Sequence, residues 1–139
     1  MSHETVDPTG DSIRRLRDEV PSDTPIVMLN LLRFRDHADY PEGSGQPTCT
    51  GREAYARYSR VALEKVRSVG GEPVFGGAVG VSVVAPRDEA WDDMLLVRYP
   101  SVAAFLRMLA MPDYQEATLH RTAALRDARL IATLESDQF

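Results

Sequence analysis

Apolar runs of strand length and apolar residues at helical spacing occur in turn along the chain and predict the order of its strands and helices. Apolar runs of strand length predict four strands, at 26–35, 73–85, 94–99 and 126–134. Apolar residues at helical spacing predict helices at 11–20, 51–69, between Ser101 and Pro112, and from Pro112 to about 125. We therefore expect a single domain over 1–139, with a helical extension at 1–24 and a core at 25–135.

The core elements follow the order β-α-β-β-α-β, with the last helical unit broken at Pro112. This order is typical of the ferredoxin-like fold, an α+β architecture in which two helices cover one face of a four-stranded antiparallel sheet. Local signals support the boundaries. Asp11 or Ser12 is expected to cap the first helix, Ser101 to cap the third, and Gly70 and Gly71 to end the second.

The predicted strands are apolar on both faces, most clearly at 28–32 and 79–85. Helices on one side of the sheet leave the other side uncovered, and no further part of the chain remains to cover it. We therefore predict a homodimer that packs through the sheet face, as in a dimeric α/β barrel. A loop at 36–50, rich in Asp, Pro, Gly and Ser, is expected to be a lid, a binding loop or a disordered insertion.

Composition and charge exclude several classes of partner. The 139 residues carry a formal net charge of -5, which disfavours nucleic acid because phosphate binding needs a basic surface. No apolar run is long enough to cross a bilayer, and the N-terminus lacks the hydrophobic core of an export signal. The single cysteine, Cys49, lies in a Pro/Gly loop and fits an inert thiol in a reducing cytoplasm. We expect a cytoplasmic protein with no membrane partner.

Five residues are the candidates for chemistry. Asn30 interrupts an apolar strand, so it either orients a ligand or is satisfied by neighbouring backbone. Arg121 lies two helical turns after Tyr114, and with Tyr58 these residues would form an anion-binding corner; the alternative is an arginine that lies over the core. His120 titrates near neutrality and is either an acid–base catalyst or a solvated surface residue.

The chain contains no GxxxxGK, HExxH, CxxC or GxSxG motif. The three histidines lie far apart along the sequence, so we expect no metal site, and we expect no cofactor.

Short motifs give the chain a resemblance to a known family. They lie at 53–58, 70–71, 76–77, 91–92, 99–101 and 112–115. In this order and spacing the chain resembles the bacterial family called domain of unknown function 1330, in the dimeric α/β-barrel superfamily. The resemblance implies a barrel dimer and implies no activity. The chain has Met108 and Met111 where the family usually has a tryptophan and a serine, and its loop at 36–50 is longer than usual.

Within that superfamily, cofactor-independent and haem-degrading monooxygenases use a strand asparagine, a helix tryptophan and a helix histidine. Asn30 is placed like the first, whereas the other two places resemble Met108 and Thr118, which disfavours haem degradation. Our leading hypothesis is a cleft that binds a small organic acid or aromatic metabolite and transforms it, if at all, without a cofactor. Asn30 and His120 are the catalytic candidates, and Tyr58, Tyr114 and Arg121 are the ligand-binding candidates. The alternatives are a non-catalytic binding or structural dimer module and a monooxygenase-like enzyme.

Overall fold

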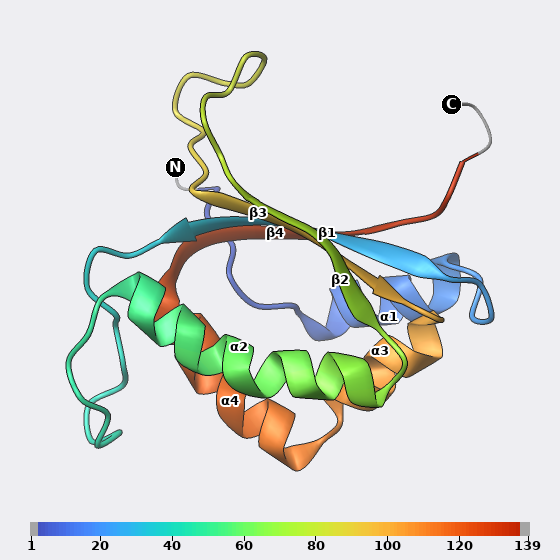
Figure 1. Ribbon diagram of the computed structural model, residues 1–139, viewed down its shortest axis with the longest axis horizontal. Coiled ribbons are helices and arrows are strands. Elements are labelled where there is room, and N and C mark those ends of the chain that lie inside the picture. Colours follow the sequence, from blue (N-terminus) through green and yellow to red (C-terminus); the bar gives the residue numbers. More distant parts are fainter. Residues whose placement is uncertain (1–2, 137–139) are drawn as a thin grey trace.

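The computed structural model describes residues 3–136, in which the four strands form one antiparallel sheet in the order β2-β3-β1-β4. The strands are β1 (Ile26–Phe34), β2 (Glu72–Ala78), β3 (Asp93–Tyr99) and β4 (Leu125–Thr133). The helices are α1 (Gly10–Glu19), α2 (Gly51–Ser68), α3 (Val102–Leu109) and α4 (Pro112–Ala124). Figure 1 shows the helices below the sheet and none above it. The predicted ferredoxin-like α+β fold is confirmed.

Short polar signals fix where the helices begin and end. Thr50 accepts a hydrogen bond from the Glu53 amide and the Glu53 carboxylate accepts one from the Thr50 amide, so α2 begins with a capping box. Ser101 caps α3 as predicted, and Gly70 has a φ of 85°, the left-handed conformation expected after α2. The predicted cap of α1 is wrong, because Thr9 is the N-cap and Ser12 is its partner three residues on.

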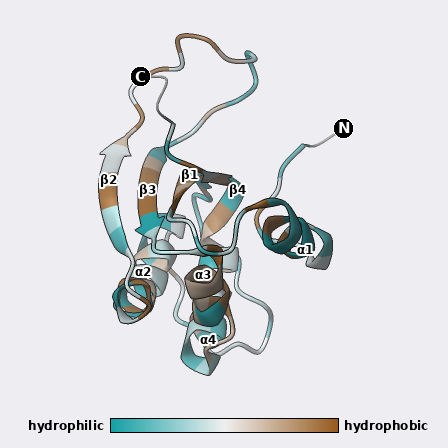
Figure 2. Ribbon diagram, turned by 90° about the vertical axis from the view of Figure 1, so that its right-hand side faces the viewer, coloured by the Kyte–Doolittle hydropathy of each residue, from teal (hydrophilic) through white to brown (hydrophobic). Residues whose placement is uncertain are grey.

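The inner face of the sheet packs against the helices and forms the main core. Ile26, Met28 and Leu32 of β1 are almost fully buried there, together with Val97 and Tyr99 of β3. The two central strands therefore alternate, with one set of side chains in the core and the other on the opposite face. Figure 2 shows α1 beside β4, at the opposite side of the sheet from β2.

The predicted second strand is wrong in its length. Pairing between β2 and β3 stops at Ala78 and Asp93, and residues 79–92 leave the sheet as an irregular extension that rises on its helix-free side (Figure 1). Val81, Val83 and Val84 belong to this extension and are 79%, 89% and 95% exposed. Their apolar pattern resembles a strand, but no strand within residues 3–136 pairs with them.

The outer face of the sheet carries an apolar surface that no helix covers. Leu29 pairs with Leu96 and Ile131 across the ladders, so these three residues share this face, and Leu31, two residues after Leu29, lies on it as well. Ile131 is 50% exposed and Phe75, which pairs with Leu96, is 53% exposed. This is the surface that the sequence assigns to a second copy of the chain.

Gly51 marks the closest approach between α2 and the rest of the core. Its amide donates to the Arg35 carbonyl at 3.1 Å, and a methyl group at this position would overlap the backbone oxygens of Arg35 and Ala124. We predict that Gly51→Ala lowers the free energy of unfolding by about 2 kcal/mol or more, because backbone atoms must shift to make room. Urea denaturation measures the loss, and Gly80→Ala, with nothing within 4 Å of the added methyl group, is the control. Equal stability of the two variants would contradict this packing.

Candidate functional site

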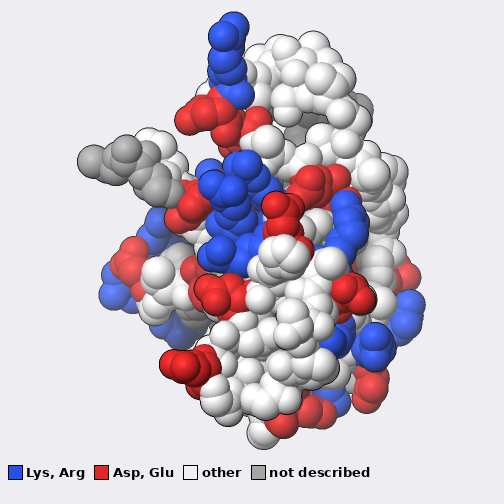
Figure 3. All heavy atoms as spheres, turned by 90° about the vertical axis from the view of Figure 1, so that its left-hand side faces the viewer, with Lys and Arg blue, Asp and Glu red and all other residues white. Residues whose placement is uncertain are grey.

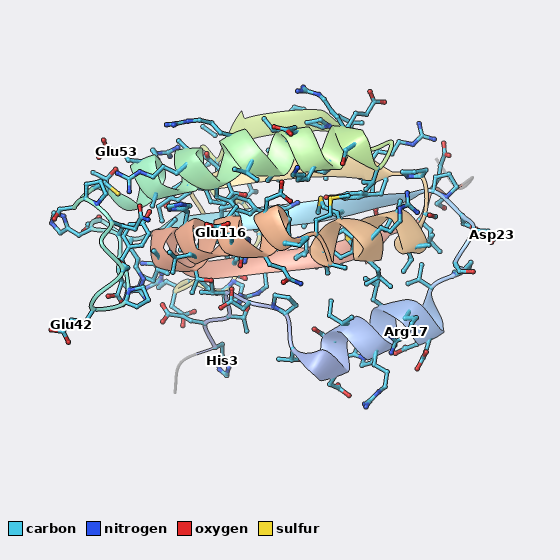
Figure 4. All side chains as sticks on the ribbon, turned by 90° about the horizontal axis from the view of Figure 1, so that it is seen from below. His3, Arg17, Asp23, Glu42, Glu53 and Glu116 are labelled. Atoms are coloured by element: carbon cyan, nitrogen blue, oxygen red, sulfur yellow. The ribbon has the colours of Figure 1, made fainter. Side chains whose placement is uncertain are left out.

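A cavity of about 930 Å³ lies between the inner face of the sheet and the helices. Its walls come from β1, β3 and β4, from α2, α3 and α4, and from the N-terminal segment that includes α1. Figure 4 shows α4, which carries Glu116, between α2 and α1, which carries Arg17. Leu130 lines the cavity and is 40% exposed, so the cavity opens beside β4.

Most of the cavity wall is apolar. The residues that provide this surface come from the sheet and from α3, and they include Met28, Leu95, Val97, Phe105, Met108 and Leu109. No residue of α1 is buried, although Leu16 and Val20 pack against the core and line the cavity. The α1 helix is therefore a lightly packed outer wall. The cavity therefore offers room and contacts for an apolar group.

A cluster of tyrosines places hydroxyl groups in the apolar wall. Tyr58 of α2 and Tyr114 of α4 are buried, and their hydroxyl oxygens lie 2.7 Å apart. Tyr55, one turn before Tyr58, also lines the cavity. Burial raises the pKa of Tyr55 to about 12 and raises the pKa of Tyr58 well above its ordinary value. These phenols are neutral at physiological pH and act as hydrogen-bond donors.

Tyr114 differs from Tyr58 in the effect of the hydrogen bond that joins them. Burial raises the pKa of Tyr114, and this hydrogen bond and the positive charge of Arg121 both oppose that rise, whereas the same hydrogen bond raises the pKa of Tyr58. When Tyr58 donates its proton to Tyr114, the proton of Tyr114 is left for another acceptor. The pair can therefore offer one O–H to a ligand in the cavity.

Arg121 places a positive charge in the same cavity wall. It is only 8% exposed, and its Nη1 donates to the Val6 carbonyl at 2.6 Å. The nearest carboxylate oxygen, on Asp7, lies 3.7 Å from Nη1, and the Asp7 side chain is 51% exposed. Within the described residues, Nε and Nη2 of Arg121 have no hydrogen-bond partner. Much of the donor capacity of this buried guanidinium is free for an anion.

Asn30 presents an amide to the cavity from the middle of β1. The residue is 9% exposed, and its Nδ2 donates to the carbonyl oxygens of Met28 and Leu95 at 3.3 and 3.4 Å. Its Oδ1 accepts no hydrogen bond from any residue that the structure describes. Asn30 lines the cavity, so this oxygen is an acceptor that faces the cavity.

His120 is placed differently, because it does not line the cavity. Its Nδ1 lies 2.7 Å from the hydroxyl of Tyr40, in the loop at 36–50, and Arg57 of α2 donates to that same hydroxyl at 3.1 Å. Since Arg57 is only a donor, the Tyr40 proton is left for Nδ1, and neutral His120 carries its own proton on Nε2. Burial and the Arg57 charge both lower the pKa of His120. These hydrogen bonds hold the loop at 36–50 against α2 and α4. The sequence alone leaves a lid, a binding loop and a disordered insertion as alternatives for this loop.

The structure brings Asn30, Tyr58, Tyr114 and Arg121 together around one cavity and leaves His120 outside it. Sequence reasoning did not identify Tyr55 as a polar group of the cavity, although its spacing from Tyr58 places both on one helix face. It also missed the contact of Val6 and Asp7 with Arg121, for which the sequence contains no signal.

Residues 3–136 contain no group of three metal-ligating side chains that could hold an ion, and no helix among them has the length and hydrophobicity for a membrane crossing. Acidic and basic side chains are interspersed over the face drawn in Figure 3, which carries no continuous basic surface. The arrangement is that of an apolar cavity with a few polar groups, a common form of small-molecule site.

Comparisons with known proteins place the chain in a family. The sequence pattern described as "Domain of unknown function (DUF1330)" matches residues 45–134. Two crystal structures of the RPA0582 protein, of unknown function, from Rhodopseudomonas palustris have TM-scores of 0.89 and 0.88, each at 39% identity. The alignments cover 99% and 96% of this chain and 98% of the other chain.

A more distant structure is a dimeric protein of unknown function with a ferredoxin-like fold from Bacteroides fragilis. Its TM-score is 0.48 at 12% identity, over 83% of this chain and 100% of that chain, and a likeness this low carries no inference. No curated protein matches the sequence. The family pattern spans α2, α3, α4 and β4, and the match at 39% identity extends over nearly the whole chain. The chain therefore belongs to the DUF1330 family, whose defining domain has no assigned function.

Proposed function

We propose that the protein binds a small organic acid with an apolar or aromatic body in the cavity between the sheet and the helices. The observation that carries the proposal is the buried guanidinium of Arg121, which has free donors and only one distant carboxylate. Burying a charge without close compensation is costly, and a ligand carboxylate would supply that compensation. Tyr114 adds a neutral O–H donor, and the surrounding apolar wall accepts the body of the ligand.

Binding is better supported than a particular reaction. The monooxygenase alternative has little support, because the positions of the helix tryptophan and histidine in that class correspond to Met108 and Thr118. Met108 is 1% exposed in the core, and the Thr118 hydroxyl donates to the Gln115 carbonyl. Asn30, Tyr58, Tyr114 and Arg121 are therefore proposed as ligand-contacting residues, and His120 as the anchor of the loop at 36–50.

We further propose that the functional unit is a homodimer in which a second copy covers the outer face of the sheet. Two observations support it: the apolar face is left open by the helices, and the extension with its exposed valines rises on that same side (Figure 1). An isologous pairing would cover both copies of this surface at once. The second copy lies on the face opposite the cavity, so the sites of the two copies stay separate.

Arg121 provides the test of the binding proposal. We predict that Arg121→Gln weakens binding of benzoate, phenylacetate or hexanoate by about tenfold or more, because the charge-assisted hydrogen bonds are lost. Isothermal titration calorimetry measures the affinity, with the corresponding uncharged amides as ligand controls. Arg126→Gln, which removes an exposed guanidinium that pairs with Glu4, should bind like the unaltered protein.

Arg121 also donates to the Val6 carbonyl, so its replacement can displace the N-terminal segment as well as remove the ligand contact. Thermal unfolding of each variant distinguishes these two effects, because a displaced segment lowers the stability. Arg121→Lys keeps the charge and should retain part of the affinity. If no carboxylate binds, or if Arg121→Gln binds as tightly as the unaltered protein, the proposed function is wrong.

The anchoring role of His120 predicts a pH dependence of stability. The pKa of His120 is lowered from 6.5 in the folded protein, so the unfolded chain binds more protons once the pH falls below that value. The contribution of the anchor is present above 6.5 and is lost as the pH falls through the lowered pKa. We predict that the stability difference between the unaltered protein and His120→Gln decreases from about pH 7 to about pH 5. Urea denaturation at each pH measures it, and parallel curves would contradict the role.

The dimer proposal predicts that Ile131→Asp prevents association, because it places a charge in the proposed apolar interface. Sedimentation velocity should show a dimer for the unaltered protein and a monomer for the variant. Leu63→Asp changes a residue of similar character on α2, away from the outer face, and should remain dimeric. A monomeric unaltered protein at micromolar concentration would refute the proposal.

A further inference from the structure

The orientation of the Asn30 amide constrains the chemistry of the ligand. Both carbonyl oxygens beside Nδ2, those of Met28 and Leu95, are acceptors only. If the amide were flipped, its oxygen would face these two oxygens and Nδ2 would point into the cavity. Two long hydrogen bonds would then be replaced by two repulsive contacts. The surroundings therefore select the orientation in which Oδ1 is exposed to the cavity.

This oxygen is an unpaired acceptor in largely apolar surroundings. Asn30 is 9% exposed and its neighbours on the inner face of the sheet, Met28 and Leu95, are apolar. Leu130, its ladder partner on β4, has no polar side-chain group to offer. Among residues 3–136, Oδ1 is not one of the fully buried side-chain atoms without a partner, which fits an oxygen that faces the open space of the cavity. A strand interior selects against asparagine unless the amide is used.

The donors around Arg121 require an acceptor on the ligand, whereas the acceptor of Asn30 requires a donor on the same ligand. Arg121 and Tyr114 offer N–H and O–H groups to an anion, whereas Asn30 offers only a carbonyl oxygen. An acid without a donor group would pair with Arg121 and Tyr114 but leave the oxygen of Asn30 unpaired. Sites that hydrogen-bond a ligand hydroxyl discriminate strongly against analogues that lack it.

We infer that the ligand is an organic acid that also carries a hydroxyl or N–H group, with the carboxylate at Arg121 and the donor at Oδ1 of Asn30. This inference rests on the proposed function, because it concerns the same cavity. It narrows the ligand from organic acids in general to hydroxy- or amino-substituted acids with an apolar body. It also makes Asn30 a specificity-determining residue that contacts the ligand.

The test compares matched acids that differ only in the donor. Calorimetry with phenylacetate, its 3- and 4-hydroxy derivatives and the corresponding methyl ethers separates a donor from an added oxygen. We expect at least one hydroxy acid to bind about tenfold or more tightly than phenylacetate, and its methyl ether to show no such gain. A methyl ether that binds as tightly as its phenol, or a series without any gain from the hydroxyl, overturns the inference.

Asn30→Leu supplies the second arm, because leucine is similar in size and has no acceptor. The preference for the hydroxy acid over phenylacetate should decrease to about twofold or less in this variant. An unchanged preference overturns the inference while leaving acid binding at Arg121 intact. If none of the acids binds even the unaltered protein, the proposed function fails and the inference fails with it. Circular dichroism and thermal unfolding establish that the variant is folded, and the methyl-ether comparison needs no variant.

Discussion

The buried guanidinium of Arg121 is the constraint on which the arrangement of this molecule depends. It joins α4 to the N-terminal segment through the Val6 carbonyl, and its charge opposes part of the rise that burial causes in the pKa of Tyr114. With 8% exposure and its nearest carboxylate oxygen at 3.7 Å, the charge is poorly compensated by the protein itself. A closer anion would compensate this charge better than Asp7 does. The same residue thus joins two walls of the cavity and carries the proposal on what the cavity binds.

The side chains of β1 alternate between the two faces of the sheet, one of which lines the cavity and the other of which no helix covers. Asn30 and Met28 face the helices and the cavity, whereas Leu29 and Leu31 face the side that no helix covers. Because side chains of neighbouring positions point to opposite faces, the ligand site and the proposed partner surface occupy the same strand without overlapping. The N-terminal segment supplies the remaining wall, next to the opening of the cavity beside β4.

Much of this architecture follows from local patterns in the sequence. Ser101 and Gly70 mark helix ends because their effect involves only adjacent residues, and the seven-residue spacing of Tyr114 and Arg121 places both on one face. The contact between Arg121 and Val6 spans 115 residues, so no local pattern contains it.

Other features depend on surroundings that the sequence does not display. The valines at 81, 83 and 84 have the composition of a strand, and only the lack of a pairing partner shows that they lie in an extension. An interrupted apolar run identifies Asn30 as unusual, but the direction of its amide depends on two carbonyl oxygens from β1 and β3. His120 lies one residue from Arg121, yet the helix turns it toward Tyr40 and away from the cavity.

A crystal structure with the tightest-binding hydroxy acid would locate the ligand relative to Arg121 and Asn30. We expect density in the cavity with a carboxylate within hydrogen-bond distance of Nε or Nη2 of Arg121, and a ligand donor within hydrogen-bond distance of Oδ1 of Asn30. Ligand density elsewhere on the molecule would contradict this expectation. So would a cavity closed by side chains, with Asp7 bonded directly to Arg121.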